Sequence, residues 1–181
     1  MRIKLVLSNS SQYECYAPIT VKEVTILGRF SSSGPNHTEF FYATSNHSGG
    51  KAYVRYSSSN STGHLKKPLI VVEGYDASLV APNLAGDNYS YESFITSLNR
   101  VVDLGYDFNY QLDDIAGYDL VFIDYNYGTD YIERNASLFK DVLNWVNADK
   151  ALGGSVQQNV VLGISMGGLV ARYALADMTK K

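Results

Sequence analysis

The second part of the sequence alternates short apolar runs with longer amphipathic segments, and this order restricts the fold most strongly. The apolar runs are residues 69–72, 120–123 and 160–162, and the segments with helical spacing that follow them are residues 90–103, about 129–147 and 166–178. Strands covered on both faces are continuously apolar, and parallel strands are joined by right-handed helical connections. We therefore predict an α/β protein, a three-layer sandwich in which three parallel strands lie side by side between helices.

The first 64 residues have a different character. Short β-favouring runs, at residues 2–7, 19–27, 39–43 and 51–56, are separated by clusters of Ser, Gly and Asn, a pattern typical of strands joined by turns. The last of these runs alternates apolar with polar residues, which predicts an antiparallel strand with one buried face. The expected organisation is an antiparallel β-rich segment, residues 1–64, followed by an α/β part, residues 65–181.

Three helix ends can be predicted from single residues. Ser90 can accept a hydrogen bond from the first turn of the helix that it precedes, and Gly105 is expected to end that helix. Thr129 or Asp130 is expected to cap the next helix in the same way as Ser90.

Composition and charge exclude several classes of function. A chain of 181 residues with 45% hydrophobic residues can bury one domain core, and its net charge of −3 argues against nucleic acid as a partner. The single cysteine, Cys15, can form neither an intramolecular disulfide nor a thiolate metal cage, and we expect no metal site. No apolar run approaches the ~18 to 20 residues of a membrane span, and the opening run is too short for a signal peptide.

Localisation stays open at this point. Six asparagines stand in Asn-x-Ser/Thr triplets, namely Asn9, Asn36, Asn46, Asn60, Asn88 and Asn135. In a eukaryotic source they would suggest a glycosylated, secreted or cell-surface protein, although a composition rich in Ser and Asn produces such triplets equally well.

The most informative motif is the Gly-x-Ser-x-Gly pattern of Gly163, Ser165 and Gly167, which lies directly between a predicted strand and a predicted helix. A serine at such a tight corner is strained, and glycines, here including Gly168, give the helix room to pass close to the strand. The hydroxyl would then stand above the carboxyl edge of the sheet, with the Met166 amide at the helix start available to a developing oxyanion. These features predict Ser165 as a catalytic nucleophile.

The stretch GISMGGLVARYAL resembles the nucleophile elbow of the α/β-hydrolase superfamily, especially the GHSMGGLVARY form of lipases and GPI-inositol-deacylase-like esterases. The resemblance covers about residues 51–181, with Ile164 and Glu73 standing where the family usually has histidines. It implies that Tyr75, after Gly74, offers the second oxyanion amide. It also implies a small-molecule or lipid ester as substrate, without a cofactor.

Other acidic groups follow the predicted strands. Glu73, Tyr75 and Asp76 could act in general acid-base chemistry, because all three lie past the carboxyl end of a strand. The segment FIDYNYGTD, residues 122–130, resembles the Asp-x-Arg-Gly-x-Gly loop of the hydrolases and contains Asp124. Asp76 and Asp124 are secondary site candidates, and we interpret Asp124 and Asp130 as residues that hold loops in place.

No histidine occupies the position that this family gives to the catalytic base. The family order is Ser, then Asp or Glu, then His, but only sixteen residues follow Ser165 and none is histidine. His37, His47 and His64 lie upstream and are interpreted as solvated loop residues. We therefore expect this chain to be the amino-terminal portion of a longer hydrolase and to be inactive alone, because an unassisted serine hydroxyl is a weak nucleophile.

Three functions remain open from the sequence. The first is a serine hydrolase of esterase or lipase type, a carboxylic-ester hydrolase when complete, acting through an acyl-enzyme on Ser165. The second is a non-catalytic binding or interaction module with the same fold. The third is acyl transfer, because the same motif serves both reactions.

Overall fold

The computed structural model describes residues 3–6, 12–15, 34–76, 90–100, 112–113 and 116–180. The chain forms two compact units, Met1–Ser31 and Ser32–Lys181. In the first unit β1 (Ile3–Val6) pairs antiparallel with β2 (Gln12–Cys15). The sequence predicts β1 but not β2, because β2 is half polar. The predicted strand at residues 19–27 lies outside the described residues.

The second unit is built on one mixed sheet with the strand order β3-β4-β6-β5-β7. Its strands are β3 (His37–Phe41), β4 (Gly50–Arg55), β5 (Pro68–Val72), β6 (Asp119–Tyr125) and β7 (Val160–Gly163). β5 pairs in parallel with both β6 and β7, which confirms the predicted parallel arrangement. β4 is antiparallel to β3 and β6, as predicted for its run. Residue 64, the expected boundary, falls between two strands of this sheet.

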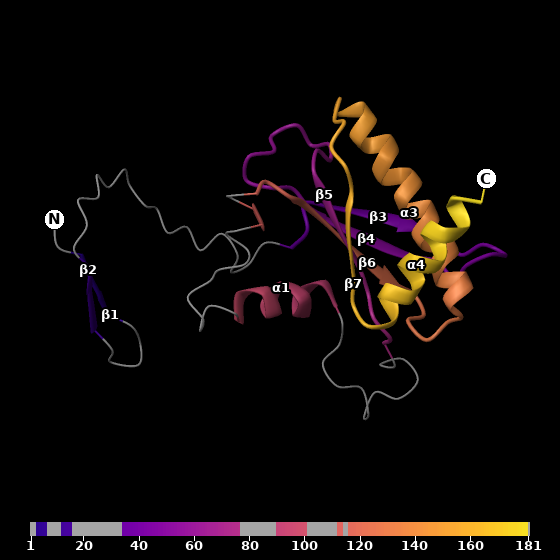
Figure 1. Cartoon of the computed structure of the whole chain (residues 1–181), viewed down its shortest axis with the longest axis horizontal. Helices are drawn as coiled ribbons and strands as arrows, with labels where there is room; N and C mark the ends of the chain where they lie inside the picture. Colours follow the sequence, from indigo (N-terminus) through magenta and orange to yellow (C-terminus); the bar gives the residue numbers. More distant parts are fainter. Residues whose placement is uncertain are drawn as a thin grey trace. The chain divides into compact units, whose positions relative to one another are not determined.

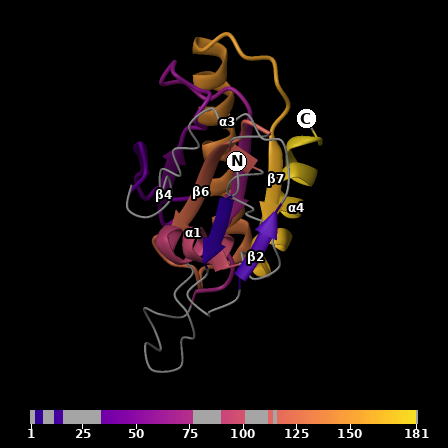
Figure 2. The same ribbon diagram turned by 90° about the vertical axis from the view of Figure 1, so that its left-hand side faces the viewer.

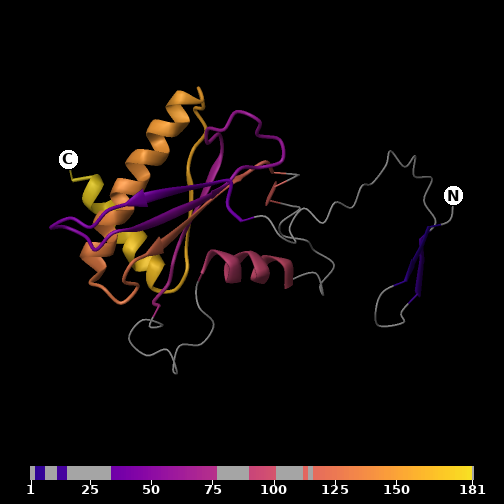
Figure 3. The same ribbon diagram turned by 180° about the vertical axis from the view of Figure 1, so that it is seen from behind.

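Helices cover both faces of this sheet. α1 (Tyr91–Arg100) packs over Leu69, Val71 and Phe122, which point to one face. α3 (Ile132–Leu152) and α4 (Met166–Met178) pack over the other face of the sheet. The alternating strand residues that point to this face are Ile70, Val72, Val121 and Ile123. The three layers can be followed in Figures 1 and 3. The fold is therefore of the predicted α/β class, with β7 at one edge of the sheet (Figure 2).

Of the two predicted helix N-caps, the structure confirms the one at α1 and contradicts the one at α3. The Ser90 hydroxyl accepts a hydrogen bond from the Ser93 amide at 3.2 Å, so the predicted cap of α1 is confirmed. The N-cap of α3 is Tyr131, without a side-chain cap, and neither Thr129 nor Asp130 holds that position. Asp130 instead bonds the Tyr131 amide and pairs with Arg134 one turn later, which secures the same end of the helix.

The far end of α3 also differs from the prediction. The helix runs to Leu152 rather than to about residue 147, because its buried stripe continues from Val146 to Lys150. The Lys150 ammonium bonds the Gln157 carbonyl and the Asn159 side chain, so its charge is satisfied although the residue is buried. The predicted end of α1 at Gly105 lies outside the described residues.

Two surface expectations can be compared with this fold. Asn135 is 1% exposed within α3, so a glycan on it is incompatible with the folded chain, whereas Asn36 and Asn46 are exposed. In the parts of the chain that the structure describes, no helix has the length and apolarity needed to cross a membrane.

Candidate active site

The turn between β7 and α4 has an unusual backbone. Ser165, which directly precedes α4, has φ 49° and ψ −118°, and it is the one non-glycine residue with positive φ among the described residues. L-residues rarely adopt this conformation, which costs on the order of 1–3 kcal/mol and persists only where surrounding contacts enforce it. The Gly167 and Gly168 amides donate to the Ile164 and Ser165 carbonyls, so the corner closes within three residues. Ser165 itself is exposed.

Two of the glycines in this turn are required by close contacts. A Cβ on Gly163 would lie 2.5 Å from the Gly168 Cα, and one on Gly167 would overlap the carbonyl oxygens of Val72 and Glu73 at the end of β5. Gly168 differs, because the nearest atom to its own Cβ position is the Gly163 oxygen at 3.8 Å. α4 can therefore pass this close to β7 and β5 only because Gly163 and Gly167 have no side chain.

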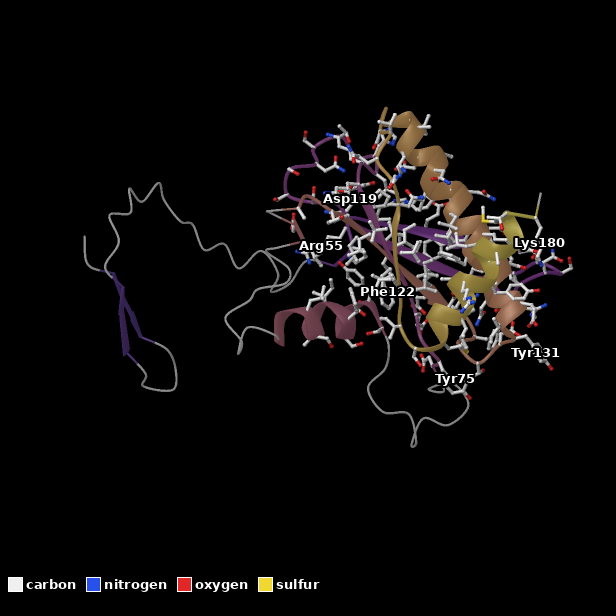
Figure 4. All side chains as sticks on the ribbon, in the orientation of Figure 1. Arg55, Tyr75, Asp119, Phe122, Tyr131 and Lys180 are labelled. Carbon is white, nitrogen blue, oxygen red and sulfur yellow. The ribbon has the colours of Figure 1, made fainter. Side chains whose placement is uncertain are left out.

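The loop after β5 packs directly against the serine turn. The Ile164 amide donates to the Val72 carbonyl at 3.0 Å, and a Cβ on Gly74 would lie 3.1 Å from the Ile164 oxygen and 3.5 Å from the Ser165 Cβ. Tyr75, the next residue, thus begins beside Ser165. Its side chain is half exposed and lies at the carboxyl end of the sheet, where Figure 4 also shows Tyr131.

The Met166 amide belongs to the first turn of α4. Amides of a first helical turn have no acceptor within the helix, and the positive end of the helix dipole lies at the same place. The two amides predicted as oxyanion donors therefore come from two segments, Met166 from the first turn of α4 and Tyr75 from the loop after β5.

The loop after β6 joins the same end of the sheet. The Cβ position of Gly128 lies 2.8 Å from the Asp76 Cβ, so the loops after β5 and β6 are in contact at this point. Asp124, near the end of β6, is half-buried and stands opposite Lys51 of β4. Burial raises the pKa of the Asp124 carboxyl, while Lys51 and a hydrogen bond from Tyr53 act in the opposite direction. The structure thus places Asp76 in the loop that packs against the serine turn at Gly74, whereas Asp124 stands opposite Lys51 of β4.

Glu73 is a buried acid beside the turn. Its side chain is 1% exposed, and its Oε2 accepts a hydrogen bond from the Tyr125 amide at 2.9 Å. Burial raises the pKa of the Glu73 carboxyl to about 8, and the negative charges of Asp124 and Asp76 act in the same direction, against the Tyr125 hydrogen bond. This carboxyl therefore holds its proton at pH 7. The sequence shows only that an acid follows an apolar strand, not that its side chain turns inward.

His64 and Ser165 lie at opposite ends of the sheet. The His64 Nδ1 faces Asp149 at 2.9 Å, and the His64 carbonyl accepts a bond from Asn60, which also bonds the buried Asp119 at the amino end of β6. Figure 4 shows Asp119 at the end away from Tyr75. The five residues of β5, at ~3.3 Å each, separate these ends by about 16 Å.

The other two histidines are also engaged elsewhere. The prediction that His47 is solvated is wrong: its side chain is 3% exposed, its Nδ1 accepts a hydrogen bond from the Gly49 amide and its Nε2 faces Asp141 at 3.1 Å. The β3–β4 loop folds inward over α3, and these two partners replace water. His37 begins β3, pairs with Glu39 and stacks on Trp145 with ring centroids 6.1 Å apart.

We expect His64→Ala to lower the free energy of unfolding by roughly 1 kcal/mol, because one partly exposed hydrogen bond to Asp149 is lost. The reactivity of Ser165 should not change, since the two residues are a strand length apart. Urea denaturation and the rate of covalent labelling of Ser165 would be measured on the same preparations. Loss of labelling at unchanged stability would contradict this assignment of His64.

No protein-family model matches the sequence, and no curated protein matches it. Among solved structures the chain is similar to an α/β serine hydrolase without a lid from Xanthomonas campestris, with 14% identity and a TM-score of 0.48. The match covers 83% of this chain and 59% of that one, so this chain spans less than two thirds of that protein's length. The chain's own three layers define it as an α/β protein with a serine turn at the carboxyl edge of the sheet.

Proposed function

We propose that this chain is the nucleophile-bearing part of a serine hydrolase of esterase or lipase type, and that the β7–α4 turn is its nucleophile elbow. The observation that carries the proposal is the backbone conformation of Ser165, whose φ of 49° is common for glycine and rare for other residues. Strain of this kind is retained where surrounding contacts enforce it, and here Gly163 and Gly167 permit contacts that any side chain would prevent. The exposed hydroxyl at the carboxyl edge of parallel strands stands where α/β proteins bind ligands.

The chemistry proposed for this geometry is acyl transfer to Ser165. The Oγ forms a bond to the carbonyl carbon of an ester, and its proton passes to a base. The negative charge that develops on the carbonyl oxygen is received by the amides of Met166 and Tyr75. Loss of the alcohol leaves an acyl-enzyme on Ser165, and water then releases the acid.

We further propose that the histidine and the catalytic acid come from polypeptide outside these 181 residues. All three histidines of the sequence lie in the described part, and each is bonded away from Ser165. The edge of the sheet supports this source, because β7 is the last strand in the order of the described strands and exposes the apolar side chains of Val160 and Leu162. An edge strand with unpaired backbone groups can accept a further strand.

The test is covalent labelling of the 181-residue chain by a fluorophosphonate probe, with imidazole added as an external base. We expect Ser165 to be modified at least tenfold faster than any other serine, since oxyanion donors alone retain ~10³-fold or more of the rate enhancement in serine hydrolases. Imidazole should accelerate the reaction further. Peptide mass spectrometry would locate and quantify the label.

Two variants make this test specific. Ser165→Ala should lose the fast labelling completely, whereas Ser137→Ala, a matched change on another helix, α3, should retain it. Equal labelling of several serines, or unchanged labelling of Ser165→Ala, would exclude the proposed nucleophile.

A second candidate is a binding module that keeps the fold without the chemistry. It is favoured by one observation, that no histidine of the chain reaches Ser165. Absence of fast labelling with imidazole, in a chain that denatures cooperatively, would support this module over the hydrolase.

A further inference from the structure

Glu73 connects the serine turn to the neighbouring strand. Its side chain accepts the Tyr125 amide at the end of β6, and its carbonyl oxygen lies against the backbone at Gly167 in the first turn of α4. One residue thus contacts β6 through its side chain and α4 through its main chain. Burial to 1% exposure leaves this side chain little freedom to move.

The two residues after Glu73 transmit its position to Ser165. Gly74 is packed so closely that a Cβ there would lie 3.1 Å from the Ile164 oxygen and 3.5 Å from the Ser165 Cβ. A shift of Glu73 would therefore move Gly74 against the serine turn and carry the Tyr75 amide with it. A donor displaced by about 1 Å loses much of its effect on a developing charge.

We propose that Glu73 is a positioning residue for Ser165, whose buried carboxyl fixes the turn of Gly74 and Tyr75 against the serine through its hydrogen bond to the Tyr125 amide. The effect on reactivity rests on the function proposed above. The packing of the turn does not, and it can be measured without any reaction of Ser165.

Charge around Glu73 makes this positioning depend on pH. Among the described residues, the titratable groups that face it are Asp124 and Tyr125 of β6, Asp76 of its own loop and Tyr53 of β4. None of these four side chains can carry a positive charge, so the hydrogen bond from the Tyr125 amide is opposed by burial and by the negative charges of Asp124 and Asp76. Its pKa near 8 makes the carboxyl neutral at pH 7 and charged above pH 9. Ionisation would add a charge beside two carboxylates and favour displacement of the turn toward water.

The first measurement follows backbone amides by NMR between pH 6 and pH 10. We expect the amide signals of Gly74, Tyr75, Tyr125 and Ser165 to shift together with one midpoint near pH 8. In Glu73→Gln, which keeps an acceptor for the Tyr125 amide but cannot ionise, this transition should vanish. It should persist in Glu133→Gln, the same change at an exposed position of α3. No common transition in the unaltered chain would overturn the proposal, even if the Gln variant failed to fold.

The second measurement is the rate of fluorophosphonate labelling of Ser165 over the same pH range. The labelling rate of the unaltered chain divided by that of Glu73→Gln should fall about tenfold between pH 7 and pH 9. The reason is that the neutral fraction of a group with a pKa near 8 falls by about that factor. A merely structural role would lower the rate of the variant without changing this ratio with pH, and that result would overturn the proposal. Absence of labelling at every pH would contradict the proposed function, and the amide shifts would then decide the positioning role.

Discussion

Gly167→Ala is expected to destabilise the chain by about 3 kcal/mol or more, although alanine normally favours a helix over glycine by about 1 kcal/mol. The added methyl would overlap two backbone carbonyls, those of Val72 and Glu73, which belong to a central strand and its end. Backbone within a packed sheet cannot move aside as a flexible side chain can. α4 would have to separate from β5, and the strained conformation of Ser165 would lose the contacts that enforce it.

Gly168→Ala is the matched control for that change. It makes the same substitution one residue later in the same helix, where the nearest atom to the new methyl would be 3.8 Å away. We expect neutral stability or a gain of up to about 1 kcal/mol. Urea denaturation of both variants and circular dichroism of the α-helical signal would compare them. Equal stability of the two variants would show that α4 does not pass β5 at the distance described.

Glu73→Gln is expected to stabilise the chain at neutral and alkaline pH. The pKa of Glu73 is raised in the folded state, from 4.5 to about 8, so its favourable contribution is fully present below pH 4.5 and is lost as pH rises to 8. A shift of this size corresponds to roughly 4 kcal/mol over that range. Glutamine does not ionise, so its contribution to stability does not change with pH. The free energies of unfolding of the variant and the unaltered chain should therefore be similar near pH 4.5 and differ by several kcal/mol at pH 8.

The measurement is the free energy of unfolding from denaturant titrations at pH 4.5, 6, 7 and 8.5. Glu133→Gln again serves as the control, since its exposed carboxyl lies on the surface of α3. A difference in the free energy of unfolding between Glu73→Gln and the unaltered chain that stays constant with pH would mean that the pKa of Glu73 is the same in the folded and the unfolded chain. A difference of the opposite sign at pH 8.5 would mean that its charged form is stabilised by the fold.

The positions of β5, β6, β7, α1 and α4 follow from local patterns. An unbroken apolar run, a capping serine and a glycine-rich corner each act within a few residues, so they are visible without knowledge of the rest of the chain. The corner at Ser165 is the clearest example, because Gly163 and Gly167 are both within two residues of it. Its placement at the carboxyl edge follows from the rule that parallel strands joined by helices end on the same side.

The sequence by itself determined the α/β class, the parallel strands and the serine at the strand-to-helix corner, because each depends on neighbours in the chain. Only the tertiary structure decided the environments of Glu73 and His47, whose partners Tyr125 and Asp141 are 52 and 94 residues away. The burial of a polar side chain depends on which distant groups can replace its water, and no local pattern carries that information. The pairing of β4 with β6 also joins distant parts of the chain, since β6 lies beyond the boundary expected at residue 64. No local pattern predicts which strand pairs with β4.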